Sequence, residues 1–166
     1  MEIRLKKKIF NPVYFPHLMD YSKRYEVYYG GAGSGKSVFI AQKLIYRALR
    51  SKRKILVLRK VNSTTKNSTF ALLLKTLSDW KLINYCKVNK SDFTITLPNN
   101  SQFLCMGLDD PEKLKSIAGI TDAWLEEATE FTQDDFNQVD LRIREQVDNS
   151  QIILSFNPVS KANWCY

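Results

Sequence analysis

A glycine-rich octapeptide constrains this chain more than any other stretch, because it fits the phosphate-binding pattern G-x-x-x-x-G-K-[ST]. Its residues are Gly30, Gly31, Ala32, Gly33, Ser34, Gly35, Lys36 and Ser37. Glycines let a loop wrap a phosphate with its N–H groups pointing inward, and a following helix adds its positive N-terminal end. Lysine supplies a charge for the β- and γ-phosphates, and serine supplies a hydroxyl for Mg²⁺. The octapeptide therefore predicts a nucleotide site in which Lys36 holds phosphate and Ser37 holds the metal.

The flanks of the octapeptide match the strand, loop and helix that the motif requires. Residues 24–29, Arg-Tyr-Glu-Val-Tyr-Tyr, are rich in side chains that favour strands. Residues 37–50 carry apolar side chains at helical spacing. A flexible glycine linker would lack both flanks, so we predict that ATP binds here together with Mg²⁺.

The rest of the chain alternates between strand and helix patterns. The apolar run at 55–58 is typical of a strand buried in a parallel sheet, the polar stretch 62–67 predicts a loop, and 68–80 predicts a helix. Further strands are predicted at 85–88, 93–97, 102–106, 123–127 and 152–156. This alternation predicts one α/β domain over residues 1–166, with a mainly parallel central sheet flanked by helices and an inserted β-hairpin.

The segment before the first predicted strand carries several aromatic side chains. Residues 11–16, Asn-Pro-Val-Tyr-Phe-Pro, predict an extended or turning entry because two prolines lie so close together. Tyr14, Phe15 and Tyr21 either stack on the adenine base or cover the edge of the sheet, and the sequence leaves both interpretations open.

Positive charge is concentrated in the first third of the chain. Residues 1–60 hold 15 Lys and Arg against 3 Asp and Glu, whereas residues 61–166 hold 10 against 14. Such a basic region attracts a polyanion such as DNA, but a solvated basic surface beside a nucleotide site has the same composition. No apolar run approaches the length of a membrane span, so we expect no membrane partner.

Two adjacent carboxylates supply what a hydrolytic P-loop still needs, an acid for Mg²⁺ and a group that orients water. Residues 123–127, Ala-Trp-Leu-Glu-Glu, predict a strand that ends in these acids. Neighbouring side chains on a strand point to opposite faces, but the backbone turns at the end, so both acids can reach one site. We assign Glu126 to the Mg²⁺ shell and Glu127 to polarising the attacking water. An exposed acidic turn is the competing interpretation.

The last predicted strand ends in Ser-Phe-Asn-Pro at residues 155–158. Small polar groups at the carboxyl end of a strand beside a nucleotide can sense the γ-phosphate. An Asn-Pro pair also simply stops a strand. Spacing alone therefore leaves the roles of Ser155 and Asn157 undecided.

The octapeptide, Trp-Leu-Glu-Glu-Ala at 124–128 and Ser-Phe-Asn-Pro occur in an order that resembles the large terminase subunit of tailed bacteriophages. Residues 107–116, Gly-Leu-Asp-Asp-Pro-Glu-Lys-Leu-Lys-Ser, resemble a segment of the same family. The likeness runs over about residues 11–164. It implies an additional-strand (ASCE) P-loop NTPase fold and an ATPase motor that drives double-stranded DNA into an empty procapsid in the host cell cytoplasm.

The resemblance also implies partners and further site residues. It implies a ring of subunits on the portal protein, working with the small terminase subunit, and we expect a monomer when the chain is isolated. Ser155 and Asn157 would couple hydrolysis to movement. A positive residue from one subunit would complete its neighbour's site, because Ala32 stands where many relatives carry arginine. The candidates for this trans-acting residue are Lys115, Arg59, Arg142 and Arg144.

The length of the chain differs from the family pattern. A complete large terminase continues into an RNase H-like nuclease, and nothing in the 166 residues provides one. We therefore expect an ATPase domain without nuclease activity and with weak turnover in isolation.

Two other function classes fit the octapeptide. One is another P-loop NTPase, such as a helicase-like ATPase or a small-molecule kinase, although a kinase would want an acceptor pocket and an arginine-rich lid. The other is a non-catalytic nucleotide-binding module that serves assembly. Stimulation of hydrolysis by DNA, without phosphate transfer to small acceptors, would separate them from the motor.

Overall fold

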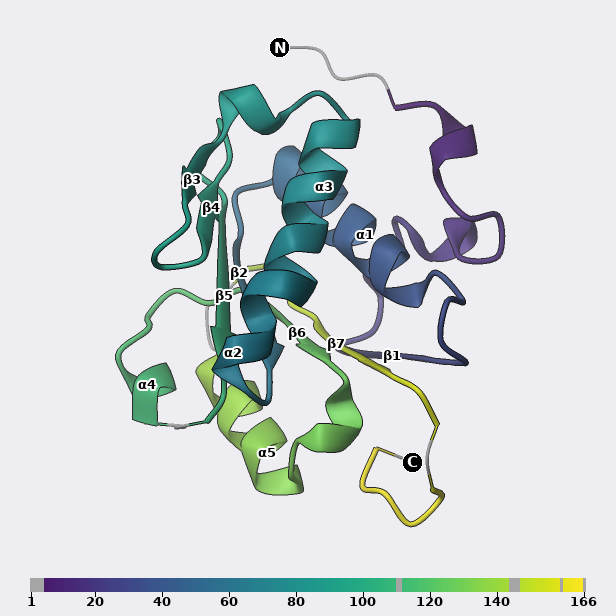
Figure 1. The fold of residues 1–166 in the computed structure, drawn as a ribbon, viewed down its shortest axis with the longest axis vertical. Helices are drawn as coiled ribbons and strands as arrows, with labels where there is room; N and C mark the ends of the chain where they lie inside the picture. Colours follow the sequence, from purple (N-terminus) through teal and green to yellow (C-terminus); the bar gives the residue numbers. More distant parts are fainter. Residues whose placement is uncertain (1–4, 110–111, 144–146, 159, 166) are drawn as a thin grey trace.

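A seven-stranded sheet forms the centre of the molecule, in the order β1-β7-β6-β2-β5-β4-β3 (Figure 1). The structure is a computed structural model that describes residues 5–109, 112–143, 147–158 and 160–165. The neighbouring strands from one edge of the sheet to its middle pair in parallel, and they are β1 (Tyr25–Tyr29), β7 (Ile152–Phe156), β6 (Asp122–Glu126), β2 (Lys54–Arg59) and β5 (Gln102–Gly107). Parallel pairing brings the carboxyl ends of these strands to the same end of the sheet, which we call its carboxyl edge.

The predicted β-hairpin is confirmed at the far side of the sheet. Strand β3 (Lys87–Asn89) pairs antiparallel with β4 (Thr94–Thr96), which pairs antiparallel with β5. The sheet is thus mainly parallel with an antiparallel insertion, as the sequence predicts. The bounds of the predicted strands differ from the observed ones by one or two residues at several ends, which is where hydrogen-bonded ladders fray.

Helices cover both faces of the sheet, so two hydrophobic clusters form (Figure 1). Helices α1 (Lys36–Arg50) and α3 (Ala71–Asp79) contribute to the cluster that includes Trp124. Helices α4 (Glu112–Lys115) and α5 (Gln133–Arg142) contribute to the cluster that includes Leu125. Trp124 and Leu125 are neighbours on β6 and point to opposite faces, as strand geometry requires. None of the described helices is long and apolar enough to cross a membrane.

The predicted loop at 62–67 is wrong, because this segment is helical. Helix α2 (Asn62–Thr65) runs through a π-helical turn (Lys66–Phe70) directly into α3, so the predicted helix at 68–80 also begins too late. Thr65 and Thr69 are fully buried and lie four residues apart on the inward face of this helix. Because the residues at these buried positions carry hydroxyl side chains, the segment has the polar composition that is typical of a loop.

Short 3-10 turns make up the remaining described elements. The entry segment contains two of them, so it turns as predicted, and the others follow α3 and β6. They are Lys7–Ile9, Phe15–His17, Ile83–Tyr85 and Ala128–Glu130.

Candidate active site

The octapeptide forms the connection between β1 and α1 at the carboxyl edge of the sheet. Gly33 and Gly35 have positive φ angles of 76° and 83°, which side chains rarely tolerate, and Gly35 is the N-cap of α1. The Ser34 hydroxyl is buried, and no hydrogen-bond partner for it exists among the described residues. A cradle that needs glycine and holds an unpartnered polar atom fits the phosphates of a nucleotide.

Lys36 is held inside the loop rather than extended into solvent. Its Nζ donates to Oδ1 of Asn157 at 2.7 Å and to the carbonyl of Gly31 at 3.4 Å, and only 6% of the residue is exposed. The contact joins the first and last motifs across the parallel pair β1 and β7. Asn157 therefore lies beside the phosphate-binding lysine, where the sequence analysis expects a residue that senses the nucleotide.

The two predicted Mg²⁺ residues meet at the same edge. Ser37, in the first turn of α1, lies close enough to the carboxylate of Glu126, which ends β6, to lower the pKa of that carboxyl. A hydroxyl and a carboxylate oxygen are hard oxygen ligands of the kind Mg²⁺ prefers. These two oxygen ligands fit Mg²⁺, and a bound Mg²⁺ would neutralise charge on the phosphates of the nucleotide.

Arg59, at the end of β2, is part of this site within its own chain. Its Nη1 donates to Oε2 of Glu126 at 3.3 Å, and its Nη2 lies 3.5 Å from Oε2 of Glu130. The Nε atom of Arg59 is buried, and it has no hydrogen-bond partner among the described residues. Sequence patterns indicate Arg59 only as a candidate trans-acting residue, and the structure places it beside Glu126, the acid predicted to hold Mg²⁺.

The charge state of Glu126 is set by opposing effects. Burial raises the pKa of its carboxyl above the ordinary value, while the nearby Arg59 and Ser37 lower it, and the neighbouring Glu127 raises it. The balance leaves the pKa raised, so the folded protein holds a proton on Glu126 more tightly than an exposed glutamate would. A metal ion at this position would favour the ionised form instead.

Glu127 leaves the strand in an unusual backbone conformation. Its φ and ψ angles are 54° and 55°, the left-handed region, and it caps the 3-10 turn Ala128–Glu130. Non-glycine residues in this region are uncommon and cluster at functional sites. The turn breaks the alternation of β6, which is what allows two consecutive acids to approach one site.

Ser155 and Asn157 have different surroundings. The Ser155 hydroxyl accepts a hydrogen bond of 2.9 Å from Nε1 of Trp124, and the residue is 1% exposed. Ser155 therefore lies in the core beneath the edge, whereas Asn157 lies at the lysine. The structure brings only Asn157 of this pair to the phosphate-binding loop.

The other candidates for a trans-acting residue have separate positions. Lys115 lies on the short helix α4 and pairs with Glu112 of the same helix. Arg142 lies in the last turn of α5, on the opposite face of the sheet from α1. Arg144 lies outside the described residues. Their proposed role in a neighbouring subunit stays a prediction.

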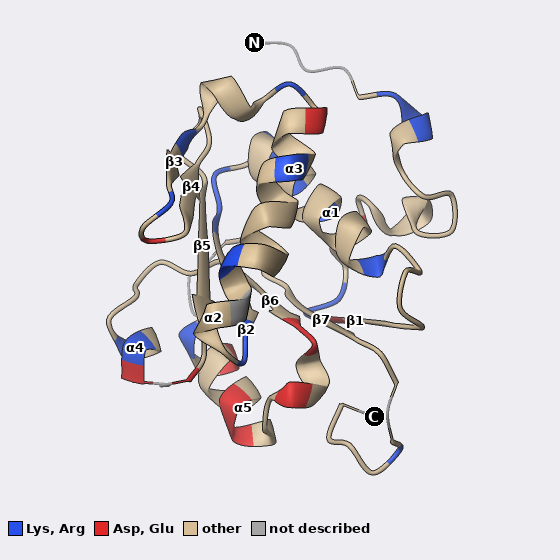
Figure 2. Ribbon diagram, viewed as in Figure 1, with Lys and Arg blue, Asp and Glu red and all other residues tan. Residues whose placement is uncertain are grey.

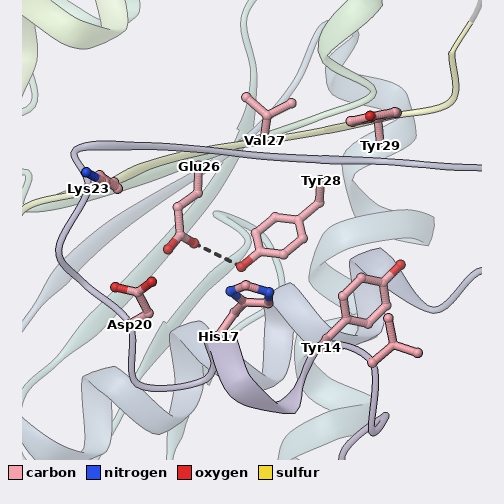
Figure 3. A pocket seen from close by; sticks show the side chains of 9 residues that line it. Tyr14, His17, Asp20, Lys23, Glu26, Val27, Tyr28 and Tyr29 are labelled. Carbon is pink, nitrogen blue, oxygen red and sulfur yellow. Dashed lines mark hydrogen bonds between the residues drawn. The ribbon is translucent and has the colours of Figure 1, made fainter.

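The aromatic entry segment packs against the face of the sheet that α1 covers, beside the edge strand β1 (Figure 3). Tyr14 stacks on Phe39 with ring centroids 5.2 Å apart and contacts Tyr28 at 5.9 Å. The side chains of Tyr14 and Tyr28 line a cavity of about 380 Å³ beside β1. These contacts support the interpretation that the aromatic residues cover the sheet edge.

Fold and site together define a P-loop NTPase. The profile of the phage terminase large subunit family matches residues 22–166. The PBSX phage terminase large subunit of Bacillus subtilis (strain 168) is 32% identical over 159 residues, 96% of this chain and 37% of that protein. The large terminase subunit of Bacillus phage SPP1 is 33% identical over 107 residues, 61% of this chain and 25% of that protein.

Solved structures agree with this assignment at the level of the fold. The large terminase from a thermophilic bacteriophage has a TM-score of 0.74 at 16% identity, over 86% of this chain and 36% of that one. The same protein in complex with ATP-gamma-S has a TM-score of 0.71 at 15% identity, over 90% and 38%. The chain belongs to the phage terminase large subunit family and has the fold of its ATPase domain. It spans about a third or less of its relatives' length.

Proposed function

We propose that this domain hydrolyses ATP to ADP and phosphate and uses the reaction to translocate double-stranded DNA into a viral procapsid. The observation that carries the proposal is the close approach of Ser37 to the carboxylate of Glu126. It joins the loop that cradles phosphate to the acid at the end of β6, as a magnesium-dependent ATPase requires. The family assignment supplies the DNA-packaging context.

Each catalytic residue has a task that its position supports. Lys36 holds the β- and γ-phosphates as a point charge, which its ammonium can do once it leaves Asn157. Ser37 and Glu126 would hold Mg²⁺, whose charge would offset that of the phosphates. Glu127 orients and polarises the water molecule that attacks the γ-phosphate. Positioning and charge stabilisation account for most catalysis of phosphoryl transfer, so these roles supply most of what hydrolysis requires within one chain.

Coupling to movement would begin at Asn157. The Lys36 ammonium contacts Oδ1 of Asn157 at 2.7 Å, so a γ-phosphate that attracts the lysine competes directly with this contact. Asn157 directly follows β7, and Ser155 is fixed to Trp124 on β6. Loss of the contact between Lys36 and Asn157 would therefore change the surroundings of the carboxyl ends of β7 and β6.

The working assembly is proposed from the family. It is a ring of this subunit on the portal protein, with the small terminase subunit, in the host cell cytoplasm, and DNA is gripped through its backbone rather than its sequence. A positive residue of the neighbouring subunit, such as Lys115, Arg142 or Arg144, would complete the γ-phosphate site. We expect no nuclease activity from this chain, which incubation with plasmid DNA and Mg²⁺ would test.

Glu127→Gln tests the catalytic assignment. We expect hydrolysis to fall by at least about a hundredfold, the order of a general base's contribution, while a fluorescent ATP analogue binds with unchanged affinity. Lys36→Ala is the comparison, because it should weaken binding and hydrolysis together. Turnover that survives Glu127→Gln would overturn the role of Glu127.

The same assay separates the alternative functions. A small-molecule kinase would transfer phosphate to an added acceptor, and a non-catalytic assembly module would bind ATP without turnover even when DNA is added. DNA-stimulated release of inorganic phosphate supports the motor against both.

A further inference from the structure

A second polar cavity lies at the opposite edge of the sheet from the P-loop. It occupies about 490 Å³ between the last turns of α1, the loop before β2, the start of β7 and the segment before β1. We call it the arginine pocket, and its polar lining residues are Tyr21, Arg47, Arg50, Ser51, Arg53 and Asn149. None of these residues belongs to the active site described above.

The arginine pocket has more positive than negative charge. Three guanidinium groups line it, and two carboxylates act on Arg47: that of Asp122, which is fully buried, and that of Glu26, which pairs with Lys43. Arg47 Nη1 lies 3.0 Å from one oxygen of Asp122, and Arg53 Nη1 lies 3.8 Å from the other. Arg50 is exposed at the pocket and donates to Tyr46 Oη at 3.1 Å, a neutral partner.

Three buried polar atoms of the pocket have no hydrogen-bond partner among the described residues. They are Oη of Tyr21, Nε of Arg47 and Nη1 of Arg53. The side chains of Arg47 and Arg53 are only 2% and 10% exposed, and the Arg47 guanidinium lies 4.3 Å from the centre of the Tyr21 ring. Each atom can donate a hydrogen bond, and buried donors without partners are costly unless a ligand or water satisfies them.

We propose that the arginine pocket binds a phosphate group of the DNA backbone. Arginine forks and a tyrosine hydroxyl match phosphate oxygens, and they recognise phosphate without reading bases. The position favours DNA, because a strand bound at this edge does not compete with ATP at the other. Many acidic residues lie away from the pocket, on α5 and on the turn after β6 (Figure 2). The proposal rests on the proposed function, since it assigns DNA contacts to that motor.

The test compares three variants of the chain for binding to a fluorescein-labelled duplex of mixed sequence by anisotropy over a series of salt concentrations. Arg50→Ala removes an exposed charge of the pocket, and Tyr21→Phe removes an unpartnered donor without changing charge. Lys75→Ala is the matched control, because it removes an exposed charge paired with Asp79 on α3. Affinity for a fluorescent ATP analogue reports that each variant keeps a folded P-loop.

Arg50→Ala should weaken duplex binding about fivefold to tenfold and reduce the slope of log affinity against log salt by about 1. Tyr21→Phe should weaken it about tenfold, the lower end of the range for one hydrogen bond to a charged ligand, and Lys75→Ala should stay close to the parent chain. If the parent binds the duplex and all three variants match it, the pocket assignment is overturned and the proposed motor stands. If the parent chain binds no duplex, DNA binding by this domain is refuted, and both the pocket assignment and the proposed motor function fail.

Two further probes identify the source of the phosphate. Inorganic phosphate should raise the melting temperature of the parent chain more than that of Tyr21→Phe, and the duplex should displace it. Phosphate binding that the duplex does not displace would assign the pocket to a small phosphate and overturn the DNA contact. Tighter binding of an acidic peptide than of the duplex would overturn it in favour of a protein partner.

Discussion

Arg59→Ala tests whether Arg59 serves its own chain. Its guanidinium lies 3.3 Å from Glu126, and the two side chains are only 13% and 12% exposed. Its other nitrogen lies 3.5 Å from Glu130, whose side chain is 46% exposed. Removing one partner of a buried ion pair costs about 3–5 kcal/mol, because the remaining charge stays buried without compensation.

The loss of stability should be somewhat smaller here. The carboxyl of Glu126, whose pKa is already raised, can take up a proton and so lose its buried charge, and we therefore expect about 2–3 kcal/mol. A domain of this size loses roughly 2–4 °C of melting temperature per kcal/mol, which predicts a fall of about 4–12 °C without Mg²⁺. Arg24→Ala is the control, because its exposed pair with Asp140 should contribute about 1 kcal/mol or less.

A role in trans would give a different result in mixed assemblies. If Arg59 completed a neighbour's site, Lys36→Ala subunits would supply their Arg59 to Arg59→Ala subunits, and mixing the two variants would restore hydrolysis. A role within the chain predicts no restoration. Restored hydrolysis, or a melting temperature as high as that of Arg24→Ala, would refute the reasoning.

Three further perturbations address single contacts. Burial raises the pKa of Glu126, and a metal ligand must be ionised. Mg²⁺ affinity, measured by calorimetry during acidification, should therefore fall at a higher pH than for an exposed glutamate, and a midpoint at the ordinary value would contradict this. Asn157→Ala removes the 2.7 Å acceptor of buried Lys36 and should cost about 1–2 kcal/mol in urea unfolding; an unchanged midpoint would count against the contact. Gly107→Ala would place Cβ 2.3 Å from the backbone nitrogen of Asn62, so we expect a loss of about 1–3 kcal/mol by thermal melting, and full stability would show that the start of α2 shifts at little cost.

The sequence predicts those parts of the fold that depend on local patterns. The P-loop, the helix after it and the strand at 152–156 have spacings that appear within one segment, and each is confirmed. Strand order is a different matter, because the position of β7 between β1 and β6 depends on pairings between distant segments. The family resemblance, not periodicity, implies the additional-strand arrangement.

The predictions from the sequence fail where buried side chains are polar. Thr65 and Thr69 face the core, so their helix lacks the apolar spacing that would have identified it. Arg59 follows a buried strand like any flanking basic residue, and only the parallel pairing of β2 with β6 brings it to Glu126. A basic residue at the end of one buried strand and a glutamate at the end of another could have suggested an ion pair. The sequence does not show which strands are neighbours, so it could not identify this pair.

The pairing of β2 with β6 also connects the amino and carboxyl ends of the parallel strands. At the amino edge Asp122 of β6 lies near Arg53, which precedes β2, and at the carboxyl edge Glu126 pairs with Arg59. A phosphate that attracts Arg53, or a metal that attracts Glu126, therefore acts on the same two buried strands from opposite ends. The strands span only about 15 Å and lie in a close-packed core that resists local deformation. We expect the double variant of Arg53→Gln and Arg59→Ala to show a measurable coupling energy in unfolding experiments, and additive effects would mean that the two edges act independently.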